Sequence, residues 1–254
     1  MIEPRPVALV TGGWRRIGAA IAGRLAVAGY DLALHAHRAE TFDPGLIAEL
    51  AALGARTHGL AGELADPAVG ERLIAEAVTA FSRAPSLLVN CASKFSEGGW
   101  QDLSADALDE HFRVNLYAPV LLTRAFARAL GAGEGSVVMI LDQRVRNPVP
   151  DQVAYSLSKQ ALAEAVRTLA RSLAPRVRVN AVAPGLVLPT DDYDDAQWRR
   201  LTALMPLETL ATPEQIADAV AWLASARAVT AQTVFVDAGA NLESYARDFV
   251  YLAK

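Results

Sequence analysis

The chain has 254 residues, of which 52% are hydrophobic and 20% charged, and its formal net charge is −4. This composition excludes a disordered or fibrous chain, and the acidic balance argues against a nucleic-acid surface or a basic membrane patch. Charges interrupt the apolar stretches, the N-terminus shows no secretory signal, and Cys91 is the one cysteine. We therefore expect a single cytoplasmic domain, residues 1–254, with no membrane span and no internal disulfide.

Apolar, strand-like runs alternate with amphipathic helical stretches along the whole chain. Strands are expected at residues 7–10, 31–35, 57–60, 86–90, 136–142, 176–182 and 233–237. Helices are expected at residues 17–28, 67–83, 114–130, 152–173 and 213–224. Gly29, Gly54 and Gly131 stand where helices are expected to end. Right-handed crossovers then predict an α/β fold, a single-domain Rossmann-type doubly wound parallel sheet of about seven strands with helices on both faces.

The first expected strand leads into the turn "TGGWRRIG", residues 11–18. Gly12, Gly13 and Gly18 let the backbone approach a pyrophosphate, and the helix that follows offers unpaired N–H groups. An ordinary tight turn is the alternative. Trp14 fits either a wall of this loop or a surface aromatic.

The end of the second expected strand, "LHAHRAE", indicates which dinucleotide binds. A site for NAD typically carries an acidic residue here, whereas this chain has His37 and Arg38. A guanidinium grips a 2′-phosphate that a carboxylate would repel, and Arg16 lies near the same ribose. The residues predict NADPH, with a solvated basic loop as the alternative.

The segment "YSLSK" places Tyr155 and Lys159 four residues apart, on one face of an expected helix. A nearby ammonium lowers the pKa of a phenol and makes it a candidate proton relay. With the glycine turn, this pair resembles the short-chain dehydrogenase/reductase family over nearly the whole chain. "LVNCAS", "FRVNLYAP", "NAVAPG" and "FVDAG" are similar to further motifs of that family.

Two departures from the family pattern stand out. Asp142 occupies the position 13 residues before the tyrosine, where the family has a serine, and Arg16 replaces a glycine or alanine. The two changes together resemble the pteridine reductase branch, as do "RRIG", "HAHR", "NCASKF" and "DDYDDAQWRRLTALMPL". That resemblance implies an NADPH-dependent reductase that transfers hydride to a dihydropterin, with dihydrofolate as an open further substrate.

The resemblance also assigns roles to residues. The catalytic group comprises Asp142, Tyr155, Lys159 and Asn115, the last holding a relay water. The expected pterin contacts are Arg16, Ser93, Phe95, Asp142 and Tyr155. The expected cofactor contacts are Gly12, Arg15, Arg16, Ile17, Gly18, His37, Arg38, Glu63, Leu64, Asn90, Ala92, Ser93, Tyr155, Lys159, Pro184, Gly185 and Leu186.

Alternatives remain open at several of these positions. Asp142 fits a structural role that caps a loop or pairs with Arg144 or Arg146, and Phe95 fits plain loop packing. For the whole chain, the alternatives are a reductase of another carbonyl or imine and an NADPH-binding protein without catalysis.

Other expectations concern partners and the C-terminal half. The helices at 114–130 and 152–173 are rich in alanine and leucine, and the family resemblance implies that they pair into a homotetramer. We expect a substrate lid at roughly 186–210, with the acids of 191–195 starting a helix. The tail "SYARDFVYLAK" is expected to pack against a neighbouring subunit. His58 and His111 have no partners at metal-ligand spacing, so no metal site is predicted.

Overall fold

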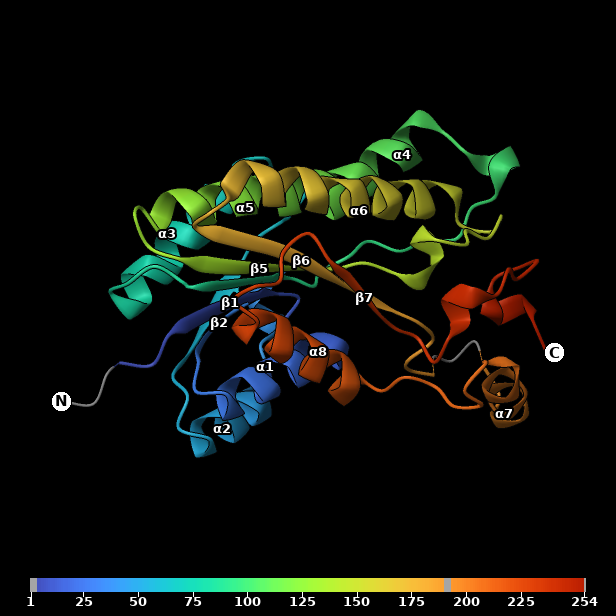
Figure 1. The fold of residues 1–254 in the computed structure, drawn as a ribbon, viewed down its shortest axis with the longest axis horizontal. Helices are drawn as coiled ribbons and strands as arrows, with labels where there is room; N and C mark the ends of the chain where they lie inside the picture. The colour runs from blue at the N-terminus through green and yellow to red at the C-terminus, as the bar shows by residue number, and fades with distance from the viewer. Residues whose placement is uncertain (1–3, 190–192, 254) are drawn as a thin grey trace.

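A computed structural model describes residues 4–189 and 193–253. Seven parallel strands form one sheet between two layers of helices (Figure 1). The strands are β1 (Val7–Thr11), β2 (Asp31–Ala36), β3 (Thr57–Ala61), β4 (Leu87–Asn90), β5 (Gly135–Ile140), β6 (Val177–Pro184) and β7 (Thr233–Val236). Their order is β3-β2-β1-β4-β5-β6-β7, with every pair parallel. The predicted doubly wound sheet is confirmed.

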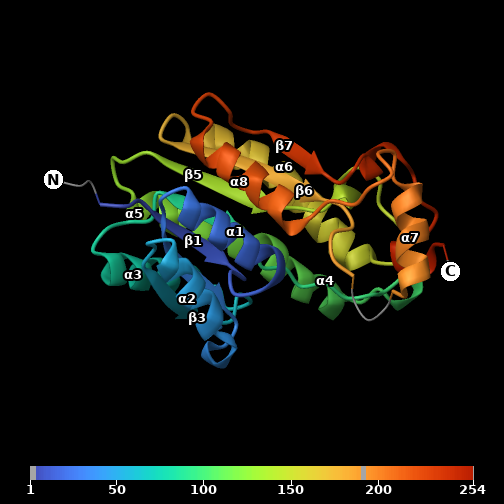
Figure 2. The ribbon, with the colours of Figure 1, turned by 90° about the horizontal axis from the view of Figure 1, so that it is seen from below.

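The helices cover the sheet in two layers. One layer contains α3 (Val69–Phe81), α5 (Ala118–Ala129) and α6 (Val153–Leu173). The other contains α1 (Arg16–Val27), α2 (Pro44–Ala52) and α8 (Pro213–Ser225), seen in front of the sheet in Figure 2. Because helices cover both faces of the central strands, every residue of β1, β2 and β4 is buried, and most of these residues are apolar.

Of α2 only the end was predicted, at Gly54, and of α7 (Asp195–Leu204) only the start, at the acids of 191–195, while α4 (Ala105–Phe112) lies outside the predicted set. The predicted helix at 114–130 begins differently, because Arg113–Tyr117 form a π-helical turn between α4 and α5. π-helical turns are rare in proteins, and those that occur often lie at functional sites. The fifth strand also ends earlier than predicted, at Ile140, so Asp142 lies just beyond it.

The C-terminal segment packs against its own chain. Phe249 is buried with Leu201 and Met205 of the α7 region, and the Gln197 side-chain amide donates to the carbonyls of Val250 at 2.9 Å and Leu252 at 2.8 Å. Figure 1 shows this segment beside α7. The expectation that the tail packs against a neighbouring subunit is therefore wrong for Phe249, because α7 supplies the apolar surface that this ring needs.

The acids expected to start a helix do so where they are described. Asp194 caps α7 by accepting from the Gln197 N–H at 2.6 Å, and Asp195 is its first residue. Asp191 and Asp192 lie outside the described residues.

The remaining surface of α5 and α6 carries exposed apolar side chains, among them Leu157 on α6 and Tyr117 just before α5. A homotetramer through these helices stays a prediction. Across residues 4–189 and 193–253, no helix combines the length and the apolar character that a membrane crossing requires.

Candidate active site

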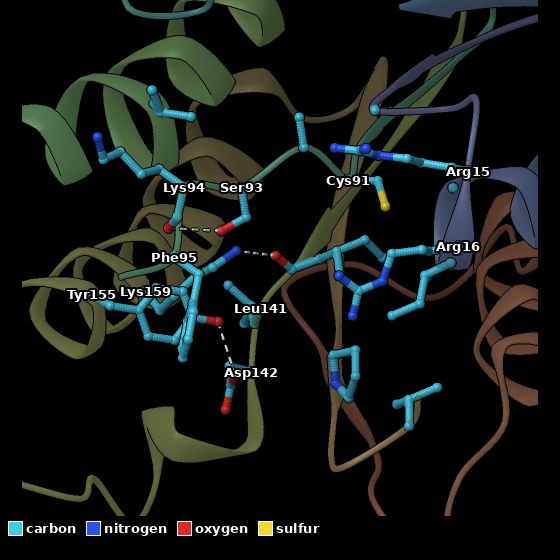
Figure 3. Close-up of a pocket in the computed structure, with 18 of the residues that line it drawn as sticks. Arg15, Arg16, Cys91, Ser93, Lys94, Phe95, Leu141, Asp142, Tyr155 and Lys159 are labelled. Carbon is cyan, nitrogen blue, oxygen red and sulfur yellow. Dashed lines mark hydrogen bonds between the residues drawn. The ribbon is translucent and has the colours of Figure 1, made fainter. Parts of the chain in front are cut away.

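A cavity of about 1000 Å³ lies along the carboxyl ends of the strands. The sheet order changes direction between β1 and β4, and ligands of open parallel sheets bind at such a switch point. Figure 3 shows Arg15 and Arg16 on one side of the cavity and Asp142, Tyr155 and Phe95 on the other. The sheet topology thus brings the two predicted ends of the site together.

The glycine turn is built for close backbone approach. A Cβ on Gly18 would lie 2.0 Å from the carbonyl oxygen of Gly12, and Gly12 itself has a φ of 64°. Thr11 ties this turn to the neighbouring loop, because its Oγ1 accepts from the N–H groups of Cys91 and Ala92, both at 3.0 Å. Tight packing of β1 against the start of α1 therefore requires glycine here.

Arg16 adopts a left-handed backbone conformation with a φ of 54°. An L-residue pays about 1–2 kcal/mol for that conformation, a cost that glycine does not carry. The guanidinium extends into the cavity (Figure 3). A strained arginine in a cavity wall indicates that its charge is used by a ligand.

Trp14 is a wall of the loop rather than a surface aromatic. It is 4% exposed, its Nε1 donates to the carbonyl of Leu34 at 2.8 Å, and its ring stacks on Phe42 at 4.5 Å. The indole thereby fixes the glycine turn against the end of β2.

The far end of the cavity carries the groups expected to meet the adenosine. His37 lines it and lies 3.0 Å from a carboxylate oxygen of Glu63. Burial lowers the pKa of His35, whose Nε2 lies 2.9 Å from the Gly62 carbonyl. Arg38 is exposed and is not among the residues that line the cavity.

The Asn115 side chain is a clamp for the loop after β4. Its Oδ1 accepts from the Lys94 N–H at 2.8 Å and the Ser93 hydroxyl at 3.1 Å. Its Nδ2 donates to the Lys94 carbonyl at 2.9 Å and to Ser158 Oγ at 3.0 Å. These four bonds use the full capacity of the amide and hold Ser93 at the cavity. The relay-water role implied by resemblance stays a prediction.

Phe95 belongs to that loop and lies on the same side of the cavity as Tyr155 (Figure 3). Its ring is 53% exposed and meets the Tyr155 ring edge to face, with centroids 4.9 Å apart. A large exposed aromatic that lines a cavity and is not buried against the loop gives a flat ligand a surface to stack on.

Asp142 and Tyr155 are hydrogen-bonded to each other. The Tyr155 hydroxyl donates to Asp142 Oδ2 at 2.8 Å, and both residues line the cavity. Asp142 Oδ1 also accepts from the Arg144 N–H at 2.8 Å, and Oδ2 accepts from Arg144 Nη1 at 3.1 Å. The carboxylate therefore caps the turn Gln143–Val145 and pairs with Arg144, as the structural alternative proposed, while it also faces the site.

The expected lowering of the Tyr155 pKa is wrong for this structure. Burial raises the pKa of Tyr155 well above its usual value, and the Asp142 carboxylate raises it further. The Lys159 ammonium lies 5.9 Å from the centre of the Tyr155 ring and donates instead to the Ile140 carbonyl at 2.8 Å. Burial lowers the pKa of Lys159 to about 8, against the effect of Asp142.

Sequence reasoning missed Arg144 and Asp248 as parts of the site. Arg144 Nη2 donates to Asp248 in the C-terminal segment, and both residues line the cavity with Phe249 and Val250. From the sequence, Arg144 was expected only as an alternative structural partner of Asp142. Asp248 lies 104 residues further on, and no local motif connects the two.

Most of the predicted cofactor and substrate residues line this one cavity. Three predicted residues do not: Arg38, Asn90 and Asn115. Asn90 is buried in β4, where its Nδ2 lies 3.2 Å from Met139 Sδ. In the part of the chain that is described, no cluster of three or more His, Cys, Asp or Glu side chains has the geometry to hold a metal. Burial raises the pKa of Cys91 to about 11, so this thiol stays protonated.

A nucleotide-binding fold whose cavity also contains Tyr155 and Lys159 of α6 is the arrangement of an oxidoreductase. Comparisons with known proteins agree. The profile of a family described as enoyl-(acyl carrier protein) reductase matches residues 13–241. Over 241 residues the chain is 32% identical to human dehydrogenase/reductase SDR family member 4, covering 92% of this chain and 86% of that protein. This chain belongs to the short-chain dehydrogenase/reductase family and is an oxidoreductase of that type.

The chain is similar to two further proteins. The chain is 35% identical to an uncharacterized oxidoreductase of Mycobacterium tuberculosis, over 92% of this chain and 91% of that one. It is also similar to the crystal structure of FolM alternative dihydrofolate reductase 1 from Brucella canis complexed with NADP. That match has a TM-score of 0.87 and 34% identity, covering 98% of this chain and 99% of the other.

Proposed function

We propose that this oxidoreductase uses NADPH to reduce a pterin ring, converting a dihydropterin to the tetrahydropterin. The observation that carries the proposal is the carboxylate of Asp142, which stands at the cavity hydrogen-bonded to the Tyr155 hydroxyl. A serine hydroxyl in that place polarises a carbonyl, whereas a carboxylate accepts hydrogen bonds from the amino and ring N–H groups of a nitrogen heterocycle. The similarity to an alternative dihydrofolate reductase supports the same substrate class.

The residues present fit NADPH. The close contact between Gly18 and the Gly12 carbonyl forms a cradle that a side chain would fill, at the start of a helix whose N–H groups suit a pyrophosphate. Arg15, Arg16 and His37 all line the cavity; the two guanidinium groups supply positive charge for a 2′-phosphate, and the His37 ring supplies a hydrogen-bonding nitrogen. The similar protein from Brucella canis was crystallised with NADP.

The chain's own groups divide the proton chemistry between them. Bound NADPH supplies the hydride. Tyr155 carries the proton for the ring nitrogen, and its raised pKa keeps the hydroxyl protonated until it donates. Asp142, ion-paired with Arg144, accepts hydrogen bonds and orients that hydroxyl. Lys159, held by the Ile140 carbonyl beneath Tyr155, brings a positive charge to the ribose side of the site.

The substrate is held as a flat ring. Phe95 offers its exposed face on one side, so the heterocycle lies between that ring and the nicotinamide, in position for hydride transfer. The guanidinium of Arg16 extends from the glycine turn into the cavity (Figure 3). In this proposal it contacts both the cofactor phosphates and the pterin, and so couples the binding of cofactor and substrate. Ser93, fixed by Asn115, supplies a hydroxyl beside them.

The test compares substrates and variants by the loss of NADPH absorbance. Dihydrobiopterin, dihydromonapterin and dihydrofolate are set against a panel of ketones and cyclic imines. We expect turnover of at least one dihydropterin, its near-complete loss in Tyr155→Phe, and a larger loss for pterins than for ketones in Asp142→Ser. Turnover of ketones alone would show a carbonyl reductase. Unchanged NADPH oxidation in Tyr155→Phe would refute the catalytic assignment.

A further inference from the structure

We propose that Asp248 is a positioning residue for this reaction, which through Arg144 fixes the catalytic carboxylate of Asp142. The inference rests on the role given to Asp142 in the proposed function. It makes the C-terminal segment, residues 245–253, part of the site.

The geometry is a bridge made by one guanidinium. Arg144 Nη1 donates to Asp142 Oδ2 at 3.1 Å, and Arg144 Nη2 donates to Asp248 Oδ2. The side chain of Arg144 is 11% exposed and that of Asp248 is 2% exposed. Because the planar fork binds one carboxylate with each terminal nitrogen, the place of Asp248 sets the place of Asp142.

Asp248 is itself held from the other side. Its N–H donates to Asp151 Oδ2 at 2.6 Å, and its Oδ1 accepts from the Val250 N–H at 3.0 Å. The Gln197 amide fixes the following carbonyls from α7, and Phe249 is buried beside it. The Asp248 side chain is 2% exposed, against 17% for that of Asp142, so we assign it a role that acts through Arg144 and not through contact with the substrate.

The charges around the bridge make it sensitive to the loss of one partner. Two carboxylates, Asp142 and Asp248, face Arg144, and the hydroxyls of Tyr155 and Tyr193 act on it as well. Lys159 acts on Asp142 from the other side, and Asp151, paired with Arg247, lies against the backbone of Asp248. Burial opposes the charge of Arg144, but Asp142 and Asp248 together raise its pKa above the usual value. Burial, Asp142 and, to a smaller extent, Asp248 raise the pKa of Tyr155. Neutralising Asp248 therefore moves Asp142 and lowers the pKa of Tyr155.

The experiment uses Asp248→Asn, which keeps the shape but has one acceptor oxygen where two are needed. Arg144→Lys keeps the charge and loses the fork. Arg24→Gln is the matched control, because Arg24 also pairs with a carboxylate, that of Asp218, but does not line the cavity. For each variant we measure the melting temperature, the NADPH Kd, kcat and KM for the substrate, and kcat against pH.

We expect kcat to fall by about 10- to 100-fold in Asp248→Asn and Arg144→Lys, since a displaced catalytic group costs rates of that order. The NADPH Kd stays within about twofold of wild type, because Asp142, which the bridge fixes, lies across the cavity from Arg15 and Arg16 (Figure 3). The alkaline limb of the Asp248→Asn profile moves to lower pH. A tail that is only structural would instead lower the melting temperature, weaken NADPH binding and leave the limb in place. That result, or a kcat for Asp248→Asn within about twofold of Arg24→Gln, overturns the inference.

The substrate used is whichever compound the wild type turns over, so the two proposals fail separately. Turnover of ketones without dihydropterins refutes the pterin function, and the same variants then test the bridge with a ketone. The ionisation of Tyr155, followed by ultraviolet difference absorbance against Tyr155→Phe, tests it without substrate. If Tyr155 begins to ionise at the same pH in wild type and in Asp248→Asn, this measurement also overturns the inference.

Discussion

Lys159 is a buried cation, and its destabilising effect can be measured from the pH dependence of the free energy of unfolding. The residue is 3% exposed, and burial lowers its pKa from 10.5 to about 8. The unfolded chain therefore binds a proton that the folded protein has lost between these two values, so stability rises with pH across that window. Burying the charged ammonium lowers the free energy of unfolding by about 3 kcal/mol at any pH below about 8. By about pH 9.5 the folded protein has lost this proton, and about 2 kcal/mol of that stability is regained.

Lys159→Met removes this titration and keeps a side chain of similar length. Urea denaturation at about pH 7 and about pH 9.5 gives the free energy of unfolding of both proteins. We expect wild type to gain about 2 kcal/mol relative to Lys159→Met between the two pH values. The lost hydrogen bond to the Ile140 carbonyl weighs equally at both and cancels.

Tyr155→Phe is the control for this comparison, because it keeps Lys159 and should follow the wild type. A difference between wild type and Lys159→Met that changes by less than about 0.5 kcal/mol with pH would refute the buried, shifted ammonium.

Three further predictions concern the cofactor end. Arg16→Gly relieves the left-handed strain at φ 54° and should stabilise the protein by about 1 kcal/mol in urea denaturation, while it weakens NADPH binding in a fluorescence titration by about 10-fold or more. Thr11→Val leaves the N–H groups of Cys91 and Ala92 without their acceptor and should cost about 2 kcal/mol or more, whereas Thr11→Ser costs less than about 1 kcal/mol; equal losses would contradict the bond assignment. Gly18→Ala forces the Gly12 carbonyl away and should raise the NADPH Kd by about 10-fold, while Gly23→Ala, in open space on the same helix, should leave it unchanged and stabilise α1 by about 0.5–1 kcal/mol.

The fold and the cofactor end were predictable because their signals are local. Alternation of apolar strands with helices identifies the parallel sheet, and the turn between β1 and α1 carries its own glycines. The helix α4 was not predicted, and α2 and α7 were predicted at one end only, because α2, α4 and α7 are short, at 9, 8 and 10 residues, and each buries only one or two residues. Their apolar periodicity is correspondingly weak.

The substrate end could be predicted only in part. Asp142, Tyr155 and Phe95 belong to recognisable segments, and the structure places all three at one cavity. Their electrostatics depend on contacts that spacing along a helix does not reveal. Lys159 shares a helix face with Tyr155, yet its ammonium bonds the Ile140 carbonyl, while a carboxylate receives the Tyr155 hydroxyl. The sign of the Tyr155 pKa shift follows from those two contacts.

The balance of charge explains why an acid can stand at position 142. Arg144 and Asp248 neutralise each other, so Asp142 contributes one net negative charge, and the Lys159 ammonium beneath Tyr155 is its counterpart. Asp142→Ser therefore leaves a balanced Arg144–Asp248 pair and a residue that still caps the turn Gln143–Val145, so the variant should fold. It also removes the carboxylate that raises the pKa of Lys159, which then falls below about 8. Removing Arg144 instead leaves two carboxylates beside Tyr155 with no cation between them. The acid at position 142 and the C-terminal segment that carries Asp248 consequently depend on each other through one guanidinium.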